Sequence, residues 1–312
     1  MNKYFKTLDE QVEILKDRGL IIDDENRAKE KLFMYNYYKL VNGTRDFFTE
    51  KGDPAKYRKG VRFDDLIDIH EFDKVLKKNF LDAILDIERH LRSIISYVFM
   101  KYHNEEKAYL NPVNFDGDQS LISANSYTLE KTISNFSEEK NYTKSINYYV
   151  GKYNHVPFWF LVNFISFGKL VNFYQTMKQK EKEEVANEFS RLFYENLAES
   201  KGYYITPFQF ESFITNIKEI RNVVAHDNMI LSYLCDEDVA YIGPIHSQWK
   251  IAKEDSRNNV FNVYLIMQIF LSKSQYRRLT FSLQDSIANL KESVDDQAFS
   301  MVMKSLGFPL DF

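Results

Sequence analysis

Apolar positions recur at spacings of three and four along most of this chain. In the longest such stretch, residues 63–103, neither Pro nor Gly interrupts the pattern. A spacing near 3.6 residues is that of an amphipathic helix. We therefore predict one long helix across residues 63–103. Its apolar stripe comprises Leu76, Phe80, Ala83, Ile84, Ile87, Leu91, Ile94, Ile95 and Val98.

A second stripe predicts a helix that ends close to His226. Thr206 is a natural N-cap, Pro207 suits the first helical position, and Gln209 lies where a capping box requires it. The apolar positions that follow are Phe210, Phe213, Ile214, Ile217, Ile220 and Val224. They lie on one face of a helix, so we expect this helix to pack against the rest of the protein.

Shorter patterns predict the remaining elements. Helices are expected at residues 7–19, from about 25 to 40, from Pro157 onward, from about 184 to 199, and at 258–273 and 281–293. Residues 42–60 contain three Gly and a Pro and are predicted to form a loop. Residues 111–147 are polar and are expected to hold one loop and one or two short helices.

The predicted fold class is all-α. We expect two parts: an N-terminal helical extension at residues 1–60, and an all-α domain at residues 61–312 with a polar insert around residues 111–147. Ten Gly and six Pro are few for 312 residues, which agrees with long helices and few sharp turns.

Composition limits the class of protein further. The formal net charge is −4, so any contact with nucleic acid must come from a local basic patch. The single Cys235 excludes an intrachain disulfide and a zinc site made of cysteines. The N-terminus has no apolar core of a signal peptide, and the most apolar runs are too short to span a bilayer. We expect a soluble cytoplasmic protein that does not associate with membranes.

The candidate chemistry lies at the end of the second predicted helix. Arg221, Asn222 and His226 fall within one and a half turns. Arg carries a forked donor set that suits phosphate oxygens, and His exchanges a proton near neutral pH. The pair fits phosphodiester chemistry without a metal. Taken by itself, the spacing also fits an exposed Arg and a His that caps a helix C-terminus.

Two local basic clusters are candidates for contact with an RNA backbone. One lies in and next to the predicted loop, and the other lies in the C-terminal quarter. Their members are Lys56, Arg58, Lys59 and Arg62, and Lys273, Arg277 and Arg278. For the loop cluster, a solvated charged loop is the default interpretation, and contact with an RNA backbone is the second. We find no clustered Asp or His set for a metal and no Gly-rich phosphate loop, so no metal or cofactor is expected.

The string Arg-Asn-x-x-Ala-His resembles the Arg-x(4–6)-His motif of HEPN-domain ribonucleases. The rest of the chain resembles one branch of these proteins, the Abi-like proteins of the AbiD/AbiF type from bacterial abortive infection systems. Five blocks carry the resemblance in the family's order and together cover about residues 4–235. They are TLDEQVEILKDRGLIIDD, NYYKLVNG, DIERHLRSIISY, KYNHVPFWFLVNFISFGKLVNFY and EIRNVVAH.

The resemblance implies a HEPN-like helical bundle that works as a homodimer, with two motif helices meeting across the interface. His226 would then be the general acid and base, Arg221 would bind the scissile phosphate, and Asn222 would position one of them. The RNA 2′-hydroxyl would be the nucleophile, and no metal would be required. On the helix that packs beside the motif helix, Glu88, Arg89 or Arg92 would orient Arg221 or His226.

Two functions from different classes follow. The first is a phage-defence toxin that cleaves RNA. The second is a non-catalytic scaffold that binds a small regulatory RNA or a protein partner; a small noncoding RNA partner is compatible with both. One departure from the family's pattern bears on the choice. Relatives often carry a basic residue after the motif His, whereas this chain has Asp227.

Overall fold

A computed structural model describes residues 5–50, 52–138, 148–149, 151–153, 155–197 and 202–312 of the chain. In this part the protein is mostly helical, and the only sheet pairs β1 (Thr49–Glu50) with β2 (Asp53–Tyr57) in antiparallel fashion. The all-α prediction is confirmed. The α-helices are α1 (Leu8–Asp17), α2 (Glu25–Tyr35), α3 (Phe63–Tyr102), α4 (Gln119–Glu138), α6 (Phe158–Leu161), α7 (Phe167–Thr176), α8 (Gln179–Asn196), α9 (Pro207–Ala225), α10 (Gly243–His246), α11 (Val260–Met267), α12 (Lys273–Ser293) and α13 (Asp296–Leu306).

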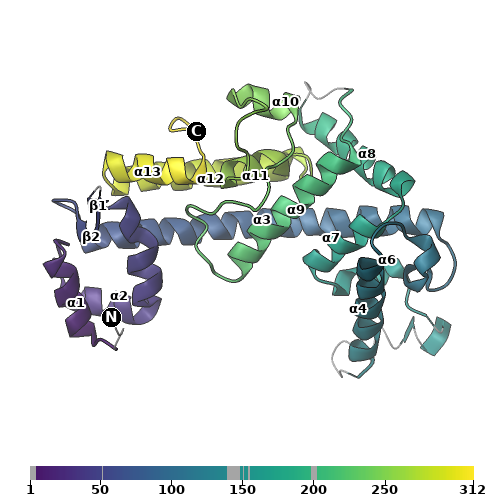
Figure 1. Ribbon diagram of the computed structural model, residues 1–312, viewed down its shortest axis with the longest axis horizontal. Coiled ribbons are helices and arrows are strands. Elements are labelled where there is room, and N and C mark those ends of the chain that lie inside the picture. The colour runs from purple at the N-terminus through teal and green to yellow at the C-terminus, as the bar shows by residue number, and fades with distance from the viewer. Residues whose placement is uncertain (1–4, 51, 139–147, 150, 154, 198–201) are drawn as a thin grey trace.

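Helix α3 runs through the whole molecule (Figure 1). Its 40 residues correspond to about 60 Å of helix. The start is fixed by Asp65, whose carboxylate accepts a hydrogen bond of 2.7 Å from the backbone N–H of Arg62. The helix ends at Tyr102, one residue before the predicted end, and buried residues recur along it from Phe63 to Phe99.

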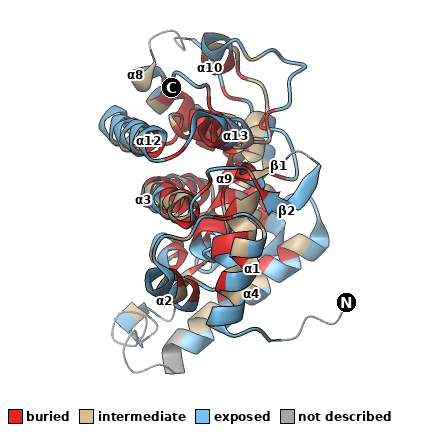
Figure 2. Cartoon of the chain, turned by 90° about the vertical axis from the view of Figure 1, so that its left-hand side faces the viewer, coloured by how far each residue is buried: buried red, intermediate tan, exposed pale blue. Residues whose placement is uncertain are grey.

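The other long helices pack on α3. Helices α8, α9 and α12 contact it directly, and α9 crosses it obliquely (Figure 1). In Figure 2 the buried residues lie on the facing sides of α3, α9, α12 and α13, and the exposed residues lie outside. The N-terminal helices α1 and α2 lie at one end of α3, and α4, α6 and α7 lie at the other. Both groups project to the same side, which gives the molecule an arched shape with a concave edge (Figure 1).

The N-terminal segment agrees with its prediction except in the loop. The predicted capping box of α1 forms, since Thr7 and Glu10 bond each other's backbone N–H. The predicted second helix stops at Tyr35, and Asn36 then takes a positive φ of 66° before a π-helical turn at Tyr38–Asn42. The loop prediction for residues 42–60 was incomplete, because the strands β1 and β2 form there. Backbone hydrogen bonds from Ile21 and Tyr57 join the segment that follows α1 to the segment that contains the strands. These bonds depend on tertiary packing, so no local sequence pattern predicts them.

Three further helix predictions need correction. The helix predicted after Pro157 is broken: α6 gives way to a 3-10 turn at Val162–Phe164, and Ser166 then caps α7. The polar insert contains a helix of 20 residues, α4, instead of only short ones, while residues 139–147 lie outside the described residues. The helix predicted at residues 281–293 begins already at Lys273, because Ser272 and Gln275 form a capping box.

The division at residue 60 stays a prediction. Leu40 and Val41 of the N-terminal segment belong to the same buried core as the long helices. Among the described residues, none of the helices combines the length and the apolar character that a membrane crossing needs.

Candidate active site

Helix α9 places the motif residues as the sequence predicted. Thr206 and Gln209 form the capping box at its start, and the apolar stripe is buried. The helix ends at Ala225, and the backbone N–H of His226 donates to the carbonyl of Asn222 over 3.1 Å. Arg221 therefore lies one turn before the helix C-terminus, where the helix dipole favours a cation.

Arg221 is held in place by a carboxylate of helix α3. Its Nε donates to Oε1 of Glu88 over 3.2 Å. The Glu88 side chain is only 8% exposed, whereas that of Arg221 is 30% exposed. The ion pair therefore fixes the guanidinium from its buried side and leaves its outer side accessible to solvent. Glu88 comes 133 residues before Arg221 in the chain.

Arg92 completes this ion-paired cluster. Its Nη2 donates to Oε2 of Glu88 over 2.9 Å, while its Nη1 donates to the carbonyls of Val162 and Ile165. The same guanidinium thus orients Glu88 and fastens the turn after α6 to α3. Two arginines share one carboxylate, so the cluster has a formal surplus of one positive charge (2 − 1 = +1). We call Glu88, Arg92 and Arg221 the arginine cluster.

The third residue predicted beside the motif lies apart from this cluster. Arg89 donates to Asp86 over 2.8 Å, and its side chain is 70% exposed. Asp86 also accepts from Arg278 of helix α12. The difference follows from helix geometry, because consecutive residues on α3 point about 100° apart.

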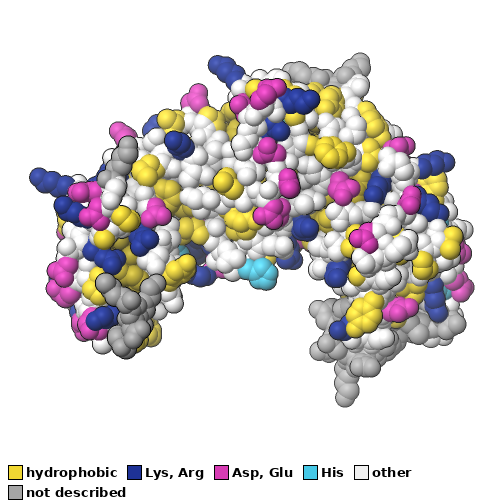
Figure 3. Space-filling model, in the orientation of Figure 1, with side chains coloured by type: hydrophobic (Ala, Val, Ile, Leu, Met, Phe, Trp, Pro, Cys, Tyr) yellow, Lys and Arg dark blue, Asp and Glu magenta, His cyan; other side chains and the backbone are white. Residues whose placement is uncertain are grey.

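His226 and Asn222 are both exposed. Within the described part of the chain, neither side chain forms a hydrogen bond or ion pair with another residue. On α9 the five-residue offset turns Arg221 and His226 roughly 140° apart around the axis. The imidazole is therefore free to act on a bound molecule, and the guanidinium is directed toward α3. In Figure 3, basic side chains and a histidine lie along the concave edge of the molecule.

The carboxylate that follows the motif histidine is neutralised by two lysines. Asp227 takes a positive φ of 53° and accepts from Nζ of Lys39 and from Nζ of Lys77, each at 2.5 Å. These hydrogen bonds lower the pKa of Asp227 to about 2, and the bond from Lys39 has the larger effect. The negative charge that departs from the family's pattern is thus compensated locally, although Lys39 lies 188 residues away in the chain.

A buried carboxylate of α3 also binds the segment that follows Asp227. Oδ1 of Asp73 accepts from the backbone N–H groups of Ile230 and Leu231, and Oδ2 accepts from Lys77 over 2.9 Å. The Asp73 side chain is 1% exposed. Lys39, Lys77, Asp73 and Asp227 form a second cluster, the lysine cluster, whose formal charge is zero (2 − 2 = 0). The sequence alone does not reveal this cluster, because all four charges belong to ordinary amphipathic stretches.

Comparison with known proteins adds one finding to this geometry. Residues 30–232 match the family model described as Abi-like protein. The chain belongs to the Abi-like family. No curated protein matches the chain, and no solved structure does. The matched range contains α3 and α9, and with them both charge clusters of this Abi-like protein.

The basic residues predicted to contact RNA near the N-terminus lie far from the arginine cluster. Arg62 precedes α3 and is separated from Glu88 by roughly 40 Å of helix. Arg58 binds Asp295 at the start of α13 over 3.0 Å and also donates to the carbonyl of Phe47, so it joins two parts of the fold. Arg62 pairs with Asp23, and Lys56 lies 3.7 Å from Glu50. Lys59 is exposed.

The C-terminal basic residues lie on helix α12. Lys273 is its first residue and is exposed, and the Arg277 guanidinium lies 5.8 Å from the ring centroid of Phe281. Arg278 pairs with Asp82 and Asp86 of α3. Contact of either basic cluster with RNA stays a prediction. In the described ranges no group of three or more His, Cys, Asp or Glu side chains is arranged to hold a metal ion.

Proposed function

We propose that this Abi-like protein is an RNA endonuclease of the HEPN type that acts as a toxin in abortive infection, the process for which the family is named. The observation that carries the proposal is the state of the two motif side chains. Arg221 is fixed through Glu88 with its outer side open, and His226 is exposed and free of partners among the described residues. A fixed cation and a free proton carrier are the two groups that cleavage through a 2′-hydroxyl needs.

In the proposed reaction, the guanidinium of Arg221 binds the non-bridging oxygens of the scissile phosphate. The neighbouring 2′-oxygen attacks phosphorus and loses its proton to an imidazole. The bond to the 5′-oxygen breaks, and that oxygen takes up a proton as it leaves. The products are a 2′,3′-cyclic phosphate and a 5′-hydroxyl, and no metal takes part in the scheme. DNA lacks the nucleophile.

A symmetric homodimer fits this scheme best. Arg221 points toward α3, and His226 lies about 140° further around α9, so one chain does not direct both groups to a single point. A twofold axis near the end of α9 would bring the imidazole of one copy toward the guanidinium of the other. The surplus positive charge of the arginine cluster favours an anionic strand at this place.

The decisive experiment incubates the purified protein with total RNA in EDTA and maps the new ends. The nuclease proposal requires 2′,3′-cyclic phosphate ends from the wild type and their loss in Arg221→Ala and His226→Ala. Arg191→Ala and His155→Ala serve as matched controls, because both lie outside the arginine cluster, on α8 and just before Pro157. Cleavage that persists in both motif variants would reject the proposal.

Mixing the two inactive variants tests the composite site. If the Arg and His of a site come from different copies, a mixture of Arg221→Ala with His226→Ala forms mixed dimers that regain part of the activity. If the mixture stays inactive although the chains exchange, the composite site is wrong. A wild type that binds RNA and yields no new ends would instead indicate a non-catalytic scaffold for a small regulatory RNA, the second candidate function.

A further inference from the structure

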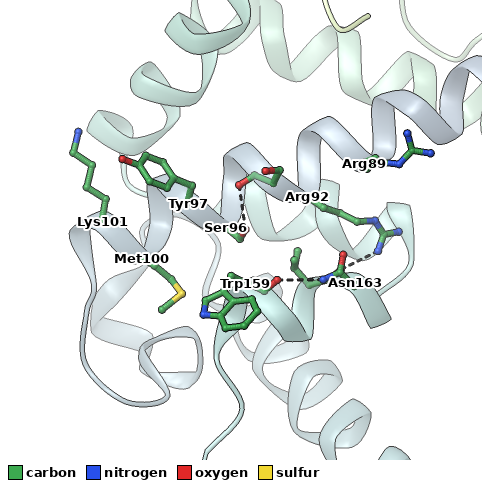
Figure 4. A pocket seen from close by; sticks show the side chains of 10 residues that line it. Arg89, Arg92, Ser96, Tyr97, Met100, Lys101, Trp159 and Asn163 are labelled. Atoms are coloured by element: carbon green, nitrogen blue, oxygen red, sulfur yellow. Dashed lines mark hydrogen bonds between the residues drawn. The ribbon is translucent and has the colours of Figure 1, made fainter. Parts of the chain in front are cut away.

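A groove of about 720 Å³ opens beside the arginine cluster, between one face of α3 and the segment from α6 to the following 3-10 turn (Figure 4). Its wall includes Arg89, Arg92, Tyr97, Lys101, Trp159 and Asn163. Tyr97 and Lys101 project from α3, and Trp159 comes from α6 on the other side (Figure 4). The volume is that of a typical site for a small ligand.

Two large aromatic side chains are unusually exposed in this groove. The exposed fraction is 69% for Tyr97 and 51% for Trp159. The ring of Trp159 also makes an edge-on contact with Tyr149, at a centroid distance of 5.9 Å. An aromatic ring that is open to solvent is suited to stacking on a planar ligand.

The charged side chains of the groove are all basic. Arg89, Arg92 and Lys101 line it, and the described lining contains no Asp or Glu. Arg89 and Lys101 each pair with one carboxylate, Asp86 and Glu184. The side chains of both cations are themselves largely exposed, so each keeps further N–H donors for a phosphate. Aromatic rings between cations are the features by which proteins bind single-stranded nucleic acid.

The groove shares one residue with the arginine cluster. Arg92 belongs to both, since it lines the groove and binds the Glu88 that holds Arg221. Glu88, Arg92 and Ser96 follow one another at four-residue spacing and so lie along one ridge of α3. From Glu88 to Ser96 this ridge covers about 12 Å, a span of a few nucleotides.

We propose that this groove binds unpaired nucleotides of the RNA strand that passes Arg221. A base stacks on Trp159 or Tyr97, and Arg89 and Lys101 contact the adjacent phosphates. Paired RNA is excluded, because a base within a duplex cannot leave its stack without losing its pairing. The inference rests on the proposed function for the choice of RNA as ligand, and it adds that the substrate is single-stranded at this place.

Binding is measured by the fluorescence anisotropy of a labelled RNA 12-mer, in the His226→Ala background so that the strand stays intact. Trp159→Leu and Tyr97→Leu each lower the affinity for the single strand about tenfold, because each variant loses one ring on which a base stacks. The same RNA as a duplex binds weakly and equally to all variants. Trp249→Leu is the matched control, since this tryptophan packs against Phe261 and Phe312 at a different surface.

A second readout uses the two tryptophans of the chain as reporters. In Trp249→Phe the remaining indole is Trp159, and a single-stranded oligonucleotide quenches its fluorescence. A DNA 12-mer does the same, because stacking needs no 2′-hydroxyl. Circular dichroism and urea unfolding establish that the leucine variants are folded.

The outcomes separate this inference from the nuclease proposal. Unchanged affinity for the single strand in both leucine variants would reject RNA binding by the groove, even if the wild type cleaves RNA. Loss of binding in these variants supports the groove, even if the wild type cleaves nothing. If Trp159→Leu instead abolishes self-association and leaves RNA binding intact, the groove is an interface between copies, and the inference is wrong.

Discussion

Two charge clusters connect α3 with the end of α9 and the turn that follows it, and they differ in their net charge. The lysine cluster pairs two cations with two carboxylates and is neutral. The arginine cluster pairs two guanidinium groups with one carboxylate and keeps a positive surplus. The first therefore stabilises the turn that follows His226, and the second presents a cation. Under the proposed function, ion pairs of a similar kind serve stability in one place and ligand binding in the other.

The largest expected effect comes from the buried anchor of the lysine cluster. Asp73→Ala leaves two buried backbone N–H groups without an acceptor and removes one of the two carboxylate partners of Lys77, so we expect a loss of roughly 4 kcal/mol in unfolding free energy. Asp73→Asn is the matched control, because its amide oxygen still accepts from the backbone and its cost is smaller. Urea unfolding measures both. Equal costs for the two variants would show that the backbone hydrogen bonds contribute little.

A smaller effect is expected in the arginine cluster. Glu88→Ala leaves Arg92 and Arg221 facing each other, but both reach solvent, so the cost is about 2 kcal/mol, below that of a fully buried pair. The freed Arg221 also loses its fixed position, and we expect RNA cleavage to fall at least tenfold. Asp82→Ala removes an exposed carboxylate from the same helix and is the control. Undiminished cleavage in Glu88→Ala would mean that Arg221 needs no orienting carboxylate.

The pH dependence of stability separates the two clusters further. The folded-state pKa of Asp227 is lowered to about 2, from an ordinary value near 4. A carboxyl with a lowered folded-state pKa stabilises the protein above its unfolded pKa, and this contribution disappears as the pH falls from about 5 toward 2. The side chain is largely exposed, so screening limits the contribution to about 1 kcal/mol.

The measurement compares wild type with Asp227→Asn. Urea midpoints should differ at pH 7 and pH 5, and the difference should shrink at pH 3 and below. Asp236→Asn, an exposed carboxylate later in the same segment, controls for general charge effects. A difference that stays constant down to pH 3 would contradict the proposed role of Lys39 and Lys77.

The smallest stability effect is expected at His226. Its side chain is exposed, so His226→Gln should change the unfolding free energy by less than about 0.5 kcal/mol. RNA cleavage should nevertheless be lost, since glutamine does not exchange protons near neutral pH. A marked loss of stability would instead assign His226 a structural role as the end of α9.

Much of the fold could be predicted from local patterns. The bounds of α3 and the capping boxes of α1 and α9 follow from residue types within a few positions, because a helix hydrogen-bonds within itself. The break after α6 and the strands in the loop could not be predicted in this way. In both places the backbone bonds to distant residues: Arg92 binds the carbonyls after α6, and the carbonyl of Arg18 accepts from the N–H of Tyr57.

The sequence by itself determined the helical class, the family and the position of Arg221, Asn222 and His226 at the end of one helix. Only the tertiary structure decided which of their neighbours matter. In the folded protein Glu88, and not Arg89, contacts Arg221, and both Lys39 and Lys77 bind the carboxylate of Asp227. The physical reason is the range of the interactions. Helix formation depends on residues close in the chain, whereas ion pairs depend on which side chains the packing of α3 against α9 brings within a few ångströms.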